Sequence, residues 1–155
     1  LTEWHALLDS PALALLFGAL ATALLQSSSV VSGLAVLAVS QGLVAPSVAV
    51  WMVAGANVGT TSTALLASAA LDQLARRLAL LNTAFNVMGV VLFSTLLQPF
   101  VSLILVSELP PSERVALVHT VFNLAAALAA LALLPGLWPR IHAWLGARPD
   151  MPPKT

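Results

Sequence analysis

The amino-acid sequence predicts an all-α fold, a polytopic transmembrane helical bundle. Of its 155 residues, 59% are hydrophobic and only 8% are charged, and the mean hydropathy is +0.98, well above the range of soluble domains. The apolar residues gather in five blocks without Asp, Glu, Lys or Arg, at residues 11–26, 30–45, 47–71, 78–100 and 115–134. We therefore expect a membrane domain at 11–135, a lead-in outside the cell at 1–10, and a tail at 136–155.

The first two blocks are too short to cross a bilayer, because a spanning helix needs about 20 residues. Only Ser27, Ser28 and Ser29 separate them. Two short apolar arms joined by polar residues are typical of a hairpin that enters and leaves the membrane on one side. The sequence thus predicts a re-entrant helical hairpin over 11–45.

The third block is long enough to span, but small and polar residues interrupt it between Gly55 and Thr61. The interruption follows Pro46 by roughly ten residues, or about 15 Å of helix, near the middle of a bilayer. We expect a broken helix over 47–71 whose freed carbonyl groups could ligate a cation. The pair Gly55 and Gly59 also fits a close helix crossing, and both interpretations can hold together.

The last two blocks, 78–100 and 115–134, have the length of ordinary spanning helices. Beyond Pro135 the chain is more polar, which indicates a short interfacial helix and a disordered tail from residue 148. Five basic residues lie on the side of the 72–77 loop and the tail, against one on the other side. The positive-inside rule therefore makes the C-terminus cytoplasmic in a multi-pass protein of the cell membrane.

A ten-residue segment occurs twice. Residues 77–86 match residues 114–123 at Arg, Ala, Leu, Thr, Phe and Asn, with an offset of 37. Consecutive crossings run in opposite directions, so the copies would enter the membrane from opposite faces, as in inverted-repeat transporters. Nine residues of helix then place Asn86 and Asn123 near the midplane.

The polar residues of the apolar blocks include no charged group. An anion there would be held by hydroxyls, amides and backbone N–H groups, and a cation by neutral oxygens. Each ion would need the other, because burying an isolated charge costs far more than burying a neutralised pair, and this dependence could couple them. Interhelical hydrogen bonding is the alternative for these residues, and His119 fits a packing role better than a metal site.

Three motifs in this order resemble one repeat of the type II sodium–phosphate cotransporters. They are Thr22-Ala-Leu-Leu-Gln26-Ser27-Ser28-Ser29, Gly55-Ala-Asn57-Val-Gly59-Thr60-Thr61, and Arg76-Arg77 followed by Thr83-x-Phe85-Asn86. The resemblance covers residues 11–134. It implies phosphate binding by Gln26, Ser27, Ser28, Ser29, Asn57, Thr60 and Thr61, and sodium binding by Gln26, Ser29, Asn57, Thr60, Asn86 and Asn123.

The function that this resemblance implies is sodium-coupled uptake of inorganic phosphate, without enzymatic chemistry, a nucleic-acid partner or any cofactor besides the coupling ion. A carrier of another small anion and a non-transporting scaffold are the alternatives. Members of this family carry two such repeats, whereas Gln-Ser-Ser-Ser occurs once here. We therefore expect one half of an inverted-repeat transporter. The missing half would be a second repeat of the same chain, which the charge bias favours, or a second copy in a homodimer.

Overall fold

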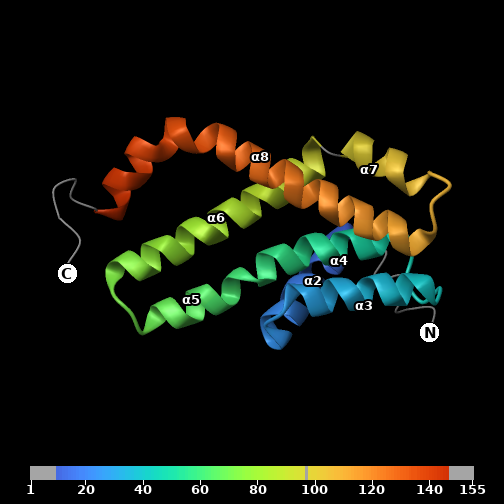
Figure 1. Cartoon of the computed structure of the whole chain (residues 1–155). Coiled ribbons are helices and arrows are strands. Elements are labelled where there is room, and N and C mark those ends of the chain that lie inside the picture. The colour runs from blue at the N-terminus through green and yellow to red at the C-terminus, as the bar shows by residue number, and fades with distance from the viewer. Residues whose placement is uncertain (1–9, 97, 147–155) are drawn as a thin grey trace.

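The computed structural model describes residues 10–96 and 98–146. All regular structure in these ranges is helical, as predicted, and the helices lie side by side along one long direction (Figure 1). The predicted lead-in, apart from Ser10, and the tail from residue 147 lie outside the described residues. The helices are α2 (Pro11–Leu25), α3 (Ser28–Ser40), α4 (Pro46–Gly59), α5 (Thr61–Ala69), α6 (Gln73–Thr95), α7 (Gln98–Leu105) and α8 (Pro111–Leu145).

Helices α2 and α3 form a helical hairpin. Gln26 has a left-handed backbone, with φ 54°, and Ser27 is extended, so two residues reverse the chain. The Ser27 hydroxyl then accepts a hydrogen bond from the Val30 N–H at 3.3 Å, which caps α3. The arms of 15 and 13 residues are about 22 and 20 Å long, shorter than the roughly 30 Å hydrocarbon core of a bilayer. The reversal lies part-way along the molecule, well short of the α5–α6 turn (Figure 1).

The interruption of the third block is smaller than the sequence predicts. Helix α4 continues to Gly59 and α5 begins at Thr61, and Thr60 between them keeps helical angles of −57° and −27°. The Thr60 N–H still donates to the Ala56 carbonyl at 3.0 Å. The hydroxyls of Thr60 and Thr61 also donate to backbone carbonyls one turn back. The break predicted over 55–61 is therefore confined to Thr60, and the Ala56 and Val58 carbonyls stay hydrogen-bonded.

Helix α2 crosses α4 with the two backbones in contact. We call Gly18, Gly55 and Gly59 the glycine seam. A methyl group on Gly55 would overlap the Leu15 carbonyl, and a methyl group on either of the other two would overlap a carbonyl on the facing helix. The predicted close crossing at Gly55 and Gly59 is thus confirmed, and it fixes the hairpin against α4.

Helix α6 begins five residues before the predicted start at 78. Asp72 caps it, because its carboxylate accepts a hydrogen bond from the Ala75 N–H at 2.8 Å. A pattern of apolar residues leaves Arg76 and Arg77 out of the predicted helix, yet both lie in the first turns of α6. The helix ends at Thr95, and the short helix α7 occupies 98–105.

Helix α8 extends beyond the predicted end at 134. It runs for 35 residues to Leu145 with Pro135 and Pro139 inside it, so the segment after Pro135 continues α8 and does not form a separate helix. Prolines are tolerated in membrane helices where neighbouring groups satisfy the freed carbonyls, but they bend the axis. Figure 1 shows this bend in the last third of α8.

Within the described residues, three stretches are long and apolar enough to cross a membrane, by length and composition. They are Pro46–Ala69, which includes both α4 and α5, Gln73–Thr95 and Pro111–Leu145. The hairpin arms fall below this length.

A stack of aromatic rings joins the three spans. Phe93 of α6 is 1% exposed, and its ring meets Trp51 of α4 and Phe122 of α8 edge to face, with centroids 5.6 and 5.2 Å apart. One side chain thus packs against both of the other spans, at the centre of the apolar core.

We expect Phe93→Ala to destabilise the fold by about 3 kcal/mol, which is the lower end of the range for truncation of a buried aromatic residue. The value is at the lower end because lipid is itself apolar, so that most of the loss comes from the cavity left by the missing ring. Thermal unfolding of the purified protein in detergent measures the change. Phe100→Ala is the control, since that ring is 60% exposed. An equal loss of thermal stability in both variants would contradict a central role for Phe93.

Candidate functional site

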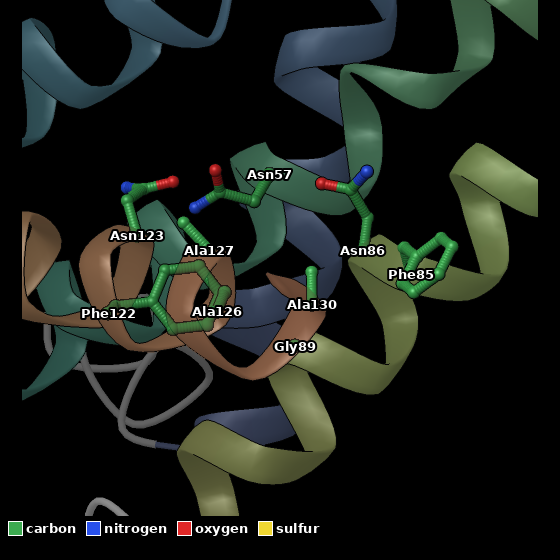
Figure 2. Close-up of a pocket in the computed structure, with 9 residues that line it drawn as sticks. All are labelled: Asn57, Phe85, Asn86, Gly89, Phe122, Asn123, Ala126, Ala127 and Ala130. Atoms are coloured by element: carbon green, nitrogen blue, oxygen red, sulfur yellow. The ribbon is translucent and has the colours of Figure 1, made fainter. Parts of the chain in front are cut away.

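A cavity of about 230 Å³ lies between α4, α6 and α8 (Figure 2). It brings together three asparagines that the sequence analysis assigned to a sodium site, one from each helix. Its lining residues are Asn57, Phe85, Asn86, Gly89, Phe122, Asn123, Ala126, Ala127 and Ala130. Apart from the asparagines this lining is apolar, so the three side-chain amides supply the side-chain polarity of the cavity.

Each of the three amide groups is held by its own helix. The Nδ2 atom of Asn57 donates to the Val53 carbonyl at 3.1 Å. Asn86 donates in the same way to the Asn82 carbonyl at 3.0 Å, and Asn123 to the His119 carbonyl at 2.9 Å. These i to i−4 bonds use a donor of each amide and fix the orientation of its side chain.

The three Oδ1 oxygens are available to a ligand. Within the described ranges 10–96 and 98–146, no hydrogen-bond donor reaches any of them. Figure 2 shows the oxygens of Asn86 and Asn123 pointing toward Asn57 from either side. A cavity that presents neutral carbonyl oxygens suits a hard cation, and no formal charge in its lining would repel or neutralise that cation.

The two copies of the repeated segment line this cavity from helices that run in opposite directions (Figure 1). Each copy contributes its phenylalanine and its asparagine, namely Phe85 and Asn86 from α6, and Phe122 and Asn123 from α8. The shared side-chain geometry extends to the threonines, since Thr83 and Thr120 each donate to the carbonyl four residues back.

The hairpin residues lie elsewhere. None of the residues 26–29 lines the asparagine cavity. Gln26 and Ser29 are exposed at the tip, and Ser27 and Ser28 are half-buried. Thr60 and Thr61 sit at the α4–α5 junction and are also absent from the lining. The predicted site therefore separates into an asparagine cavity and a polar hairpin tip.

Comparison with known proteins gives the family. The family described as "Na+/Pi-cotransporter" matches residues 4–134 of this chain. The chain belongs to the Na+/Pi-cotransporter family. It is therefore a multi-pass membrane protein of a transporter family, which is not a class of enzymes.

Two relatives extend this comparison. The "Uncharacterized protein YqeW" of Bacillus subtilis is 31% identical over 140 residues, which are 90% of this chain and 46% of that protein. The "Putative inorganic phosphate export protein YjbB" of Salmonella typhimurium is 34% identical over 88 residues, 57% of this chain and 16% of that protein. The chain thus spans about half the length of the Bacillus subtilis relative, and its match covers a smaller part of the Salmonella typhimurium relative. No solved structure gives a significant match.

Three buried hydroxyls of this cotransporter-family chain are not among the site residues that the sequence predicts. The Oγ1 atom of Thr22 and the Oγ atoms of Ser32 and Ser62 have no hydrogen-bond partner within the described ranges. Thr22 is fully buried beside Gly59, one turn before Gln26. The position of Thr22 in the motif before Gln-Ser-Ser-Ser is the one feature of the sequence that could have indicated a site residue. The burial of its hydroxyl could not be predicted, because it depends on the packing at the glycine seam.

Proposed function

We propose that this chain is one repeat of a sodium-coupled transporter of inorganic phosphate. Family membership and the name of the Salmonella typhimurium relative support a phosphate transporter. The observation that carries the coupling ion is that three asparagines line one cavity and that no donor of the described residues reaches their side-chain oxygens.

Sodium would bind in the asparagine cavity. Oxygen atoms are the ligands of hard alkali cations, and the side chains of Asn57, Asn86 and Asn123 bring one carbonyl oxygen each to this cavity. Because each amide is already oriented by its own backbone, little ordering of side chains is needed on binding. Gln26, Ser29 and Thr60 remain candidate ligands for a further sodium ion near the hairpin tip.

Phosphate would bind at the hairpin tip. Helix α3 begins there, and the free N–H groups of its first turn give this end of the helix a partial positive charge. The hydroxyls of Ser28 and Ser29 lie in the same turn. Ser27 already caps this helix, while the side chain of Gln26 makes no hydrogen bond to another described residue. Asn57, Thr60 and Thr61 on the neighbouring α4–α5 element complete the proposed phosphate set.

The hairpin is proposed to be re-entrant. Its arms of about 20 Å cannot cross a core of roughly 30 Å, and its reversal lies part-way along the molecule. A polar tip at that depth needs protein, water or ligand around it, because lipid cannot satisfy it. We propose that a second, inverted repeat supplies the remaining contacts, in the same chain or from a second copy, with the C-terminus cytoplasmic.

Transport by the intact protein in proteoliposomes tests this function. We expect radiolabelled phosphate to accumulate when an inward sodium gradient is imposed, and to leave when the gradient is reversed, because the ion gradient sets the direction of a symporter. Potassium in place of sodium should abolish both fluxes. Phosphate flux that is equal in sodium and potassium would overturn the sodium coupling. The absence of any phosphate flux would overturn phosphate as the substrate, in favour of a carrier of another small anion or a non-transporting scaffold.

We expect Ser28→Ala to raise the phosphate concentration at half-maximal uptake about tenfold, the loss of one hydrogen bond to a charged group, while the yield of folded protein stays unchanged. Ser40→Ala is the matched control at the other end of α3, where the hydroxyl is exposed and donates to the Leu37 carbonyl. Phosphate dependence equal in Ser28→Ala and wild type would remove Ser28 from the site.

A further inference from the structure

A second cavity lies between α6 and the bent end of α8. It measures about 400 Å³ and shares no residue with the asparagine cavity. We call it the α6–α8 groove. Its floor and walls are apolar except for one guanidinium group, and its lining is Leu80, Leu81, Ala84, Arg140, Ile141 and Trp144.

One wall of the α6–α8 groove is fixed by Arg77. The Nη1 atom of this arginine donates to the Trp144 carbonyl at 2.6 Å, and its guanidinium carbon lies 5.7 Å from the centre of the Trp144 ring. The bond satisfies a carbonyl in the last turn of α8, where a positive charge is also favoured. Trp144 is thereby held against the start of α6, and the groove keeps its shape.

Arg140 is differently placed. Its side chain is exposed at the groove and makes no hydrogen bond or ion pair with another residue of the described ranges. By contrast, Arg76 donates to the carbonyls of Ser68 and Ala69, so it and Arg77 are already engaged. Arg140 thus presents a guanidinium beside an apolar groove with its donors available to a ligand.

The surroundings correspond to the edge of a bilayer. Trp138 and Trp144 lie on the same helix end as Arg140, and both indoles are about half exposed. Tryptophan and arginine together are typical of the level of lipid headgroups, where an indole ring and a long basic side chain both have one apolar and one polar end. The groove floor then faces acyl chains.

We propose that the α6–α8 groove binds one anionic phospholipid. Its acyl chain lies along Leu80, Ala84 and Ile141, and its phosphate accepts hydrogen bonds from Arg140. The guanidinium plane matches two phosphate oxygens at once, and the groove has the apolar surface that a free phosphate ion would not use. Binding of this lipid is independent of transport, so it can be measured without any phosphate or sodium gradient.

Native mass spectrometry of the intact protein with equal amounts of phosphatidylglycerol and phosphatidylcholine tests the proposal. We expect wild type to retain phosphatidylglycerol preferentially, and Arg140→Gln to lose about fivefold of that preference, the effect of one basic side chain near a lipid surface. Arg140→Lys keeps the charge but loses the planar pair of donors, so it should keep only part of the preference. Ala84→Trp fills the groove and should lower retention of the lipid with every charge in place.

His142→Gln is the matched control, because this side chain lies on the same turn region and packs beside Trp138 instead of lining the groove. Thermal unfolding confirms that each variant is folded. A preference for phosphatidylglycerol that survives in Arg140→Gln would overturn the proposal. Displacement of the lipid by millimolar inorganic phosphate would also overturn it, in favour of a site for the free ion.

Discussion

Gly55→Ala is expected to prevent the chain from folding. The added methyl group would overlap the Leu15 carbonyl, a backbone atom that no side-chain rotation can move away. Relief requires α2 and α4 to separate, and that costs more than the roughly 1–3 kcal/mol of an ordinary overpacked core. The yield of monodisperse protein in detergent, followed by thermal unfolding of what remains, measures the loss.

Gly33→Ala is the matched control for this substitution. Gly33 also lies inside a helix, but a methyl group there meets no atom within 4 Å. Alanine has the higher helix propensity, so this variant should fold at least as well as wild type. If Gly55→Ala gave the same yield and unfolding temperature as Gly33→Ala, the contact between the backbones of α2 and α4 would be wrong.

Asn123→Ala is expected to lower sodium-driven phosphate uptake at least tenfold. The substitution removes one of the three oxygens in the asparagine cavity, and an interaction of a polar group with a charge contributes about 1.5–3 kcal/mol. The sodium concentration at half-maximal uptake should rise accordingly. Asn57→Ala and Asn86→Ala should act in the same direction, because their oxygens face the same space. Initial rates in proteoliposomes over a range of sodium concentrations measure the effect.

Thr120→Ala controls for the loss of a polar side chain from α8. Thr120 is exposed and donates to the Ala116 carbonyl, and it does not line the cavity. Its uptake should match that of wild type. Unchanged sodium dependence in all three asparagine variants, at equal amounts of folded protein, would exclude this cavity as the sodium site.

The meeting of Asn86 and Asn123 was predictable from the sequence, because a repeated segment and a fixed rise per residue place both at the same depth. Asn57 was predictable in the same way, by counting residues from Pro46. The close crossing at Gly55 and Gly59 followed from their spacing of four. Periodicity and spacing therefore predict three of the cavity's side chains and one helix contact.

Other features depended on interactions that spacing does not encode. Apolar blocks exclude charged residues, so they place the start of α6 too late, at residue 78. The helix begins at Gln73, where Asp72 caps it. A proline in an apolar block predicts the end of a helix, yet α8 bends and continues through Pro135 and Pro139. The unpaired hydroxyl of Thr22 could not be foreseen either, since its burial results from packing between α2 and α4.

The glycine seam also determines which parts of this chain can move separately. Where two backbones touch without side chains between them, no rotamer change can let one helix slide along the other. The hairpin and α4 must therefore travel as a single rigid body. The contact of α4 with α6 and α8, by contrast, is made by side chains, both aromatic and aliphatic, and borders a cavity, and such surfaces can repack. In the proposed transporter the hinge would lie there, with the hairpin tip and Asn57 moving relative to Asn86 and Asn123.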